Sequence, residues 1–277
     1  ECSGNSGSLW RELSTADAHT TTGTAQSTHG LVSCSEWVGV PLSVLLRESG
    51  VQPTGTWLVA EGADACRLTR SIPLAKALSD TLVAYGQNGE ALRPGQGYPL
   101  RLFVPGWEGN ISVKWLRRIE VVDEPYMTRE ETSKYTDLLP DGRARRFTFM
   151  MEAKSVITHP SGGQRLASPG YHQISGIAWS GRGRVERVEV SVDGGQSWRK
   201  AELQGPVLPL AHTRFRLDWL WDGSDVILQS RCVDNTGYTQ PTRDELIAAR
   251  GLQSGYHNNA IQSWKVATDG TVENVYV

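Results

Sequence analysis

The four cysteines of this chain limit which metal centres it can build. They are Cys2, Cys34, Cys66 and Cys232, and they form neither a C-x-x-C pair nor a C-x-x-C-H sequence. Covalent haem attachment and an iron–sulfur cluster on closely spaced thiolates are therefore disfavoured, and the six histidines lack the H-x-x-x-H spacing of a zinc site. Because a thiolate is a soft ligand that suits a redox-active metal, we expect any metal to be held by few side chains or mainly by an organic cofactor.

Length and charge exclude several other classes of protein. The chain has 277 residues, enough for one large domain or two medium ones, and a net charge of −2. That charge argues against nucleic acid as a partner, since nucleic acid calls for a concentrated basic surface. No apolar run approaches the roughly 20 residues that a membrane helix needs. The chain begins at Glu1 and shows no signal peptide, which says nothing about its compartment.

The first half of the chain mixes predicted helices and strands. Residues 1–35 are rich in Ser, Thr and Gly and are predicted to be mostly loop. A helix is predicted over residues 41–50, because Pro41 suits a first turn and Gly50 a C-terminal stop. Asn88-Gly89 predicts a tight hairpin turn. The predicted strands cover residues 56–60, 82–85, 100–104 and 113–122.

The second half reads as all-β from Met151 onward. Val188, Val190 and Val192 alternate with polar residues, which is typical of a half-buried strand. A turn over residues 193–195 leads to a return strand from Trp198, and residues 226–233 predict another strand. This spacing predicts an immunoglobulin-like β-sandwich. The predicted fold class is therefore α+β, with one mixed domain over residues 1–145 and a sandwich over residues 150–277.

Several segments together resemble the sulfite oxidase family of molybdenum enzymes, and they follow that family's order along essentially the whole chain. The ordered set is more specific than any single motif. It comprises Cys2-Ser3-Gly4-Asn5, Glu36-Trp37-Val38-Gly39-Val40, Ser71-Ile72-Pro73-Leu74, Asn88-Gly89-Glu90-Ala91-Leu92, Gly97-Tyr98-Pro99-Leu100-Arg101, Val104-Pro105-Gly106, Val113-Lys114-Trp115-Leu116-Arg117-Arg118-Ile119, Ala178-Trp179-Ser180-Gly181, Ser191 to Trp198, and Arg250-Gly251.

The resemblance implies a molybdenum–molybdopterin cofactor and assigns residues to it. Cys2 matches the protein ligand to molybdenum, and Tyr135 and Arg250 match active-site residues. Arg214 and Arg216 stay open as alternatives to Arg250. The residues expected to line the pterin site are Asp64, Ser71, Gln96, Arg101 and Lys114, with Gln96 standing where better-known sulfite oxidases have a histidine. Arginine presents a planar fork and lysine a mobile point charge, and both suit the pterin phosphate.

Two departures from the family pattern concern the substrate. Ser6-Gly7 stands where sulfite oxidases have an arginine that helps bind sulfite, and Ser33 falls near the family's substrate-site tryptophan. Loss of a charged donor weakens binding of a small free anion, and small residues open room. These departures favour a sulfur atom that is delivered on a carrier arm.

The segments 1–7, 29–37 and 128–135 resemble the molybdenum subunit of sulfane dehydrogenases of the bacterial thiosulfate-oxidising (Sox) pathway. The resemblance implies an oxidoreductase that oxidises carrier-bound sulfane sulfur (a persulfide) to the sulfonate level in the periplasm. It implies electron transfer to a separate c-type cytochrome subunit, since this chain carries no motif for haem or an iron–sulfur cluster, and a homodimer formed through the sandwich. It further implies that the N-terminal part of the molybdenum domain is missing, so that this length of chain would hold the cofactor poorly.

Three alternatives remain open. A sulfite dehydrogenase of the same fold would act on free sulfite, and Ser6-Gly7 argues against it. A non-catalytic interaction module would use the sandwich alone, and the joint presence of Cys2, Lys114, Tyr135 and Arg250 argues against that. A propeller hydrolase is suggested by the turn over residues 191–198, which resembles an Asp-box, but it occurs once and a propeller needs repeated blades.

Overall fold

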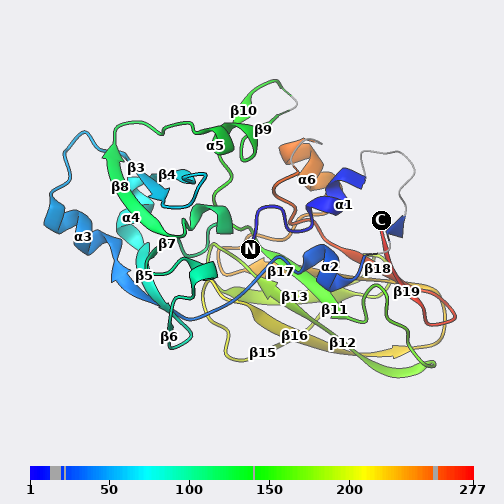
Figure 1. Ribbon diagram of the computed structural model, residues 1–277. Helices are drawn as coiled ribbons and strands as arrows, with labels where there is room; N and C mark the ends of the chain where they lie inside the picture. Colours follow the sequence, from blue (N-terminus) through cyan, green and yellow to red (C-terminus); the bar gives the residue numbers. More distant parts are fainter. Residues whose placement is uncertain (13–19, 22, 140, 252–254) are drawn as a thin grey trace. The chain divides into compact units, whose positions relative to one another are not determined.

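The computed structural model describes residues 1–12, 20–21, 23–139, 141–251 and 255–277. The chain forms two compact units (Figure 1). The first, here called the sandwich unit, comprises residues 1–32, 137–144 and 150–277. The second, here called the α/β unit, comprises residues 33–136 and 145–149. The domain division predicted from the sequence, 1–145 and 150–277, stays a prediction. In the structure, residues 1–32 belong to the same compact unit as the sandwich.

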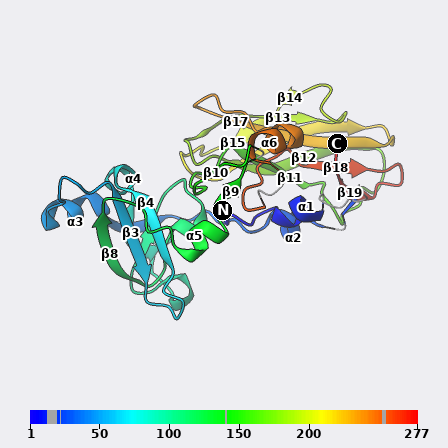
Figure 2. The same ribbon diagram turned by 90° about the horizontal axis from the view of Figure 1, so that it is seen from above.

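The α/β unit contains two small antiparallel sheets. In one sheet β5 pairs with β2, β6 and β7, and in the other β3 lies between β4 and β8. The helices α3 and α4 lie side by side in both views of the molecule (Figures 1 and 2). The strands are β2 (Trp37–Pro41), β3 (Trp57–Gly62), β4 (Thr69–Pro73), β5 (Leu82–Gln87), β6 (Glu90–Ala91), β7 (Arg101–Phe103) and β8 (Leu116–Val122). The helices are α3 (Leu42–Ser49), α4 (Leu74–Ser79) and α5 (Arg129–Ser133), with 3-10 turns η1 (Pro94–Gln96) and η2 (Gly109–Ile111).

Local chemistry accounts for the elements of this unit that the sequence predicted. The helix α3 follows Pro41, buries Leu42 and Leu46, and ends at Gly50 with a φ of 74° that suits glycine. Asn88 and Gly89 both have positive φ in the β5–β6 turn, as a two-residue hairpin requires. The strand expected over residues 113–122 begins only at Leu116. The prediction was therefore right for these elements and too long for β8.

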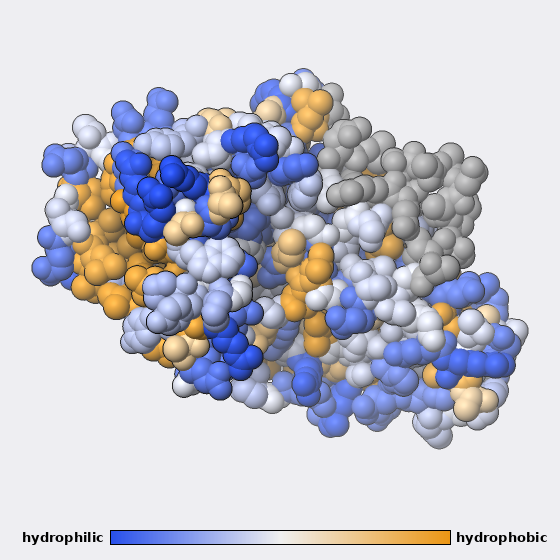
Figure 3. All heavy atoms as spheres, in the orientation of Figure 1, coloured by the Kyte–Doolittle hydropathy of each residue, from blue (hydrophilic) through white to orange (hydrophobic). Residues whose placement is uncertain are grey.

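An apolar groove runs along one side of the α/β unit, with a volume of about 790 Å³. Leu45 and Leu46 of α3 line it together with Ile119 and Val121 of β8. Hydrophobic side chains gather over α3 in the space-filling view (Figure 3). Val44 of this helix is exposed. The core beneath is formed by buried aliphatic residues of α3, α4 and the two sheets.

The sandwich unit is built from a six-stranded and a four-stranded sheet. The strand orders are β1-β19-β18-β17-β13-β14 and β11-β12-β16-β15. The strands are β1 (Thr20–Thr21), β11 (Lys154–His159), β12 (Gly170–Trp179), β13 (Val185–Ser191), β14 (Arg199–Lys200), β15 (Glu202–Gln204), β16 (Thr213–Trp221), β17 (Val226–Asp234), β18 (Ser263–Val266) and β19 (Val272–Val275). A separate short pair joins β9 (Asp137–Leu138) and β10 (Ala144–Arg145).

The alternating pattern seen in the sequence identifies side chains that are buried in the core of the sandwich. Val188 and Val190 are fully buried in β13, and Cys232 is fully buried in β17, as expected. They pack in one cluster with large side chains such as Phe215 and Trp264. Burial raises the pKa of the Cys232 thiol well above its usual range. Cys232 is therefore an inert core thiol.

Three helices of the sandwich unit were not predicted. Residues 1–35, expected to be mostly loop, contain α1 (Gly7–Glu12) and α2 (Ala25–His29), while α6 (Arg243–Arg250) follows the sheet strands. Thr24 and Thr242 each begin a helix with a capping box, closed by Ser27 and Glu245. No helix in the described ranges is long and apolar enough to cross a membrane.

Candidate active site

Cys2 lies at the start of a tight loop in the sandwich unit. Its backbone N–H donates to the carbonyl of Leu31 at 2.9 Å, and its own carbonyl accepts from the N–H of Asn5 at 2.9 Å. The side chain is exposed and is a free thiol. The structure therefore presents the predicted metal ligand on a backbone fixed at both sides.

The side chain of Asn5 ties this loop together. Its Nδ2 donates to Glu1 Oε1 at 2.9 Å, and its Oδ1 accepts from the N–H of Leu31 at 3.1 Å. Asn5 is almost fully buried. The asparagine of the Cys2-Ser3-Gly4-Asn5 motif thus has a structural role. Its amide joins Glu1, which precedes Cys2, to Leu31, whose carbonyl accepts from the N–H of Cys2.

A buried lysine of the sandwich contacts residues at both ends of the same loop. Lys154, on β11, is fully buried, and its Nζ lies 2.9 Å from Glu1 Oε1 and 2.8 Å from Ser6 Oγ. Trp179 Nε1 donates to the other oxygen of Glu1 at 2.9 Å. Burial raises the pKa of Glu1, but Lys154 and its other partners outweigh this and hold it at about 2. Glu1 is therefore a carboxylate at neutral pH, and it neutralises the buried ammonium.

Ser6 is turned into the sandwich unit. It is buried, its φ is 64°, and its carbonyl accepts from Asn258 Nδ2 at 3.1 Å. Its hydroxyl lies 2.7 Å from His29 Nδ1. The Ser6 hydroxyl accepts from the Lys154 ammonium, and its remaining donor and acceptor positions let it pair with Nδ1 in either tautomer of the imidazole. Burial and Lys154 both lower the pKa of His29, to about 3, so the ring is neutral at physiological pH.

Arg250 lies at the end of α6 among acidic side chains of the same unit. Its guanidinium is 3.3 Å from Asp137 and 3.2 Å from Glu152. His257 Nε2 lies 3.1 Å from the same Glu152 oxygen. Burial raises the pKa of Glu152, but His257 and Arg250 lower it by more than burial raises it. The pKa is therefore below its ordinary value, and the carboxylate stays ionised. Of the two alternatives to Arg250, Arg216 is paired with Glu202 at 2.8 Å on a partly exposed surface.

In the α/β unit, Gln96, Arg101 and Lys114 surround one turn. Arg101 donates to the carbonyls of Gln96 and Ser112 at 3.1 and 3.0 Å, and Lys114 Nζ donates to the carbonyl of Gly95 at 3.1 Å. Burial lowers the pKa of Arg101 to about 10. The structure thus brings these three predicted residues together, with Arg101 holding the backbone and the Lys114 ammonium keeping donors to spare.

Glycines keep this turn close to the segment before β8 that carries Lys114. A Cβ on Gly97, whose φ is 105°, would lie 3.0 Å from Lys114 Cβ. A Cβ on Gly62 would meet Asp64 Oδ1 at 2.7 Å. Asp64 accepts from the Cys66 thiol at 2.7 Å, which, with other contacts, lowers its pKa. The Asp64 carboxylate and the Lys114 backbone therefore both lie close to Gly62.

Ser71 and Tyr135 belong to a second cluster of the α/β unit. Ser71 gives both its N–H and its hydroxyl to Glu131, at 2.5 and 3.1 Å. Tyr135 has the guanidinium of Arg70 over its ring, 4.5 Å from the centroid. Arg70 and Glu131 were not singled out from the sequence. The available signal was the strand period, since Arg70 shares a face of β4 with the buried Ile72.

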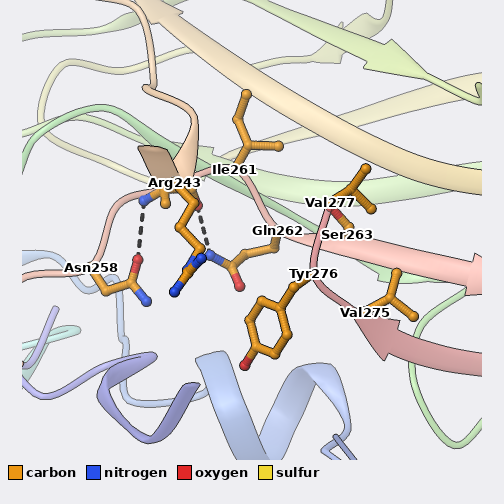
Figure 4. A pocket seen from close by; sticks show the side chains of 9 residues that line it. Arg243, Asn258, Ile261, Gln262, Ser263, Val275, Tyr276 and Val277 are labelled. Atoms are coloured by element: carbon orange, nitrogen blue, oxygen red, sulfur yellow. Dashed lines mark hydrogen bonds between the residues drawn. The ribbon is translucent and has the colours of Figure 1, made fainter. Parts of the chain in front are cut away.

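A small pocket of the sandwich unit is not a substrate site. It lies beside α6, with Arg243 and Tyr276 among its lining side chains, and its volume is about 20 Å³ (Figure 4). Asn258 and Gln262 are both occupied by hydrogen bonds to the backbone of Ala260. A space of this size holds one water molecule.

The side chains that the structure provides fit a molybdopterin cofactor. The exposed sulfur of Cys2 is a soft ligand that suits molybdenum. Lys114 offers free donors to a phosphate, and the buried guanidinium of Arg70 has no hydrogen-bond partner at any nitrogen. Among the described residues there is no group of three or more His, Cys, Asp or Glu side chains placed to hold a metal. Cys2 and Arg250 lie in the sandwich unit, whereas Asp64, Ser71, Gln96, Arg101, Lys114 and Tyr135 lie in the α/β unit.

Two family models match the chain in succession. Residues 1–130 match the oxidoreductase molybdopterin binding domain, and residues 145–264 match the Mo-co oxidoreductase dimerisation domain.

Known proteins give the same result. The mitochondrial sulfite oxidase of Drosophila melanogaster is 34% identical over 261 residues, covering 82% of this chain and 45% of that protein. The sulfite oxidase of Gallus gallus is 32% identical over 76% of this chain and 51% of that protein, so the chain spans about half the length of these relatives. The crystal structure of the sulfane dehydrogenase SoxCD from Paracoccus pantotrophus has a chain that is 54% identical, with a TM-score of 0.93 over all of this chain and 70% of that one. This chain belongs to the sulfite oxidase family of molybdopterin-binding oxidoreductases.

Proposed function

We propose that this chain is the molybdenum-binding part of a sulfane dehydrogenase. In this proposal it oxidises a sulfane sulfur that a carrier protein presents as a persulfide, and it passes the electrons to a c-type cytochrome subunit. The proposal further includes a homodimer through the sandwich unit and a periplasmic location. The 54% identity to a chain of a sulfane dehydrogenase supports this reading over the more distant sulfite oxidases.

The orientation of Ser6 is the observation that carries the substrate assignment. Its side chain points inward to Lys154 and His29, and residues 1–7 include no lysine, arginine or histidine side chain. A small free anion such as sulfite needs charged donors to bind. A persulfide held by a carrier protein needs fewer, since the carrier's own surface contributes to binding.

In the proposed reaction the bound cofactor supplies the oxygen-atom transfer and accepts the electrons. Each oxygen atom added to the sulfur comes from one water molecule and releases two protons and two electrons. Cys2 would bind the metal, and Lys114 and Asp64 would face the pterin. Arg101 positions the turn at residues 94–97, and Ser71 fixes Glu131 beside Arg70. Tyr135 would move protons to and from the sulfur group, and Arg250 would contribute positive charge.

Metal and pterin analysis tests the cofactor assignment. The full-length gene product is made in a host that synthesises molybdopterin, as wild type, Cys2→Ala and Cys34→Ala. We expect molybdenum near one per chain in the wild type and in the Cys34→Ala control, and its loss in Cys2→Ala with unchanged circular dichroism. An intact wild-type protein without molybdenum would refute the assignment and leave the non-catalytic interaction module.

Substrate preference tests the reaction. The purified complex is given persulfide-loaded carrier or free sulfite, and cytochrome c reduction is measured. We expect the loaded carrier to be oxidised at least tenfold faster. Equal rates with free sulfite would point instead to a sulfite dehydrogenase, the second candidate.

A further inference from the structure

Arg70 is a buried cation whose hydrogen-bonding capacity is unused. It lies on β4, its side chain has no exposed surface, and Nε, Nη1 and Nη2 all lack a hydrogen-bond partner. A buried guanidinium with unpaired N–H groups costs free energy that the fold does not recover elsewhere. Such a group points to a ligand that completes it.

The neighbouring carboxylate does not complete Arg70. Glu131 Oε1 is 4.0 Å from Arg70 Nε, which is an ion pair without a hydrogen bond. Both oxygens of Glu131 are already occupied, by the N–H and hydroxyl of Ser71 and by the N–H of Thr128 at 3.0 Å. Glu131 therefore places a negative charge near Arg70, while its oxygens accept hydrogen bonds from Ser71 and Thr128.

The ring of Tyr135 lies against the face of the Arg70 guanidinium, so it does not use the N–H groups at the guanidinium edge. The Cζ atom of Arg70 lies 4.5 Å from the ring centroid, a cation–π contact. The N–H groups of a guanidinium point outward in its plane, where they match two oxygens of a carboxylate, phosphate or sulfonate. Burial lowers the pKa of Arg70, while Glu131, Tyr135, Glu108 and Glu130 raise it. An arginine stays protonated in such surroundings.

We propose that Arg70, stacked on Tyr135, is the receptor for a tetrahedral oxyanion. The ligand chemistry is that of a phosphate monoester or of a sulfur oxyanion, supplied by the pterin cofactor or by the oxidised sulfur group. The inference rests on the proposed function for the choice between these two sources, and the oxyanion site itself does not depend on it.

Binding to the cofactor-free full-length protein tests the site directly. Inorganic phosphate and sulfite are titrated by calorimetry into wild type, Arg70→Gln, Arg70→Lys and the matched control Arg129→Gln, an exposed arginine of α5. We expect Arg70→Gln to weaken binding of at least one anion tenfold or more, and Arg129→Gln to leave both unchanged. Arg70→Lys keeps the charge beside Glu131 and loses the fork, so it should be intermediate and also serves if Arg70→Gln does not fold.

The holoenzyme separates the two sources. If the ligand is the cofactor phosphate, the Arg70 variants will retain several-fold less molybdopterin per chain than wild type. If the ligand is the oxidised sulfur group, pterin content will stay normal and the affinity of the holoenzyme for sulfite will fall tenfold. Folded variants that match wild type within twofold in pterin content and in both anion affinities would overturn the inference. Because neither readout requires turnover, a failure of the sulfane dehydrogenase assignment would be seen separately, in the substrate assay.

Discussion

Lys154 Nζ lies 2.8 Å from Ser6 Oγ, across 148 residues of sequence. The same ammonium is 2.9 Å from Glu1, so one buried lysine of β11 contacts the residues before and after the Cys2 loop. Together with Trp179 of β12, which donates to Glu1, this lysine joins core strands of the sandwich to the segment that carries the proposed metal ligand. It makes the position of Cys2 dependent on the sandwich.

Replacing Lys154 with methionine should destabilise the protein by about 3–5 kcal/mol, because the carboxylate of Glu1 is left buried without its counter-charge. Urea denaturation at pH 7 measures the change. Lys200→Met, on an exposed part of β14, is the control and should have little effect. A Lys154→Met protein as stable as that control would show that the loop does not rely on this ion pair.

The pKa of His29 predicts an acid-sensitive fold. The pKa of His29 is about 3 in the folded protein, and the ordinary pKa of a free histidine is 6.5. Below pH 6.5 the unfolded chain therefore takes up a proton that the folded chain does not. The free energy of unfolding should therefore fall by up to about 1.4 kcal/mol per pH unit from this group as pH drops from 6.5 towards 3. His29→Asn should flatten that slope relative to wild type in denaturation curves between pH 4 and 7. The exposed His159→Asn should keep the wild-type slope, and an unchanged slope in His29→Asn would contradict the assignment.

Glu152 should stabilise the sandwich unit through Arg250 and His257. Its pKa is lowered in the folded protein, so the stabilisation is present above its ordinary pKa and is lost as pH falls through the folded value. Glu152→Gln should cost about 2 kcal/mol at pH 7, since charge-assisted hydrogen bonds are lost. Chemical denaturation at pH 7 and at successively lower pH checks this, with the more exposed Glu186→Gln as control. A difference from wild type that did not shrink in acid would exclude an electrostatic origin.

Gly97 and Gly95 form a matched pair for testing the turn beside Lys114. Gly97→Ala forces a Cβ to within 3.0 Å of Lys114 Cβ at a φ of 105°, and it should cost about 1–3 kcal/mol. Gly95→Ala meets nothing within 4 Å and should be tolerated. Thermal unfolding measures both, and pterin analysis of the holoenzyme shows whether the turn contributes to cofactor retention. Equal melting temperatures for the two variants would mean that the close approach at Gly97 is not required.

Local patterns were enough for much of the secondary structure. The alternation at Val188 and Val190 predicted β13, and Asn88-Gly89 predicted the β5–β6 turn, because both depend on neighbours in sequence. The helices α2 and α6 were missed although each starts with a capping box. Both are short, and their stability comes from tertiary packing rather than from intrinsic helix propensity.

The sequence by itself determined the chemistry on offer: a thiolate at Cys2, an asparagine beside it, a phenol at Tyr135, and no arginine at residues 6 and 7. Only the tertiary structure decided how those groups are held. Lys154 and Arg70 look like ordinary surface cations in the sequence, yet both side chains have no exposed surface. A charged side chain reveals its role only through its burial and its partners, and for Lys154 those partners lie about 150 residues away in the chain.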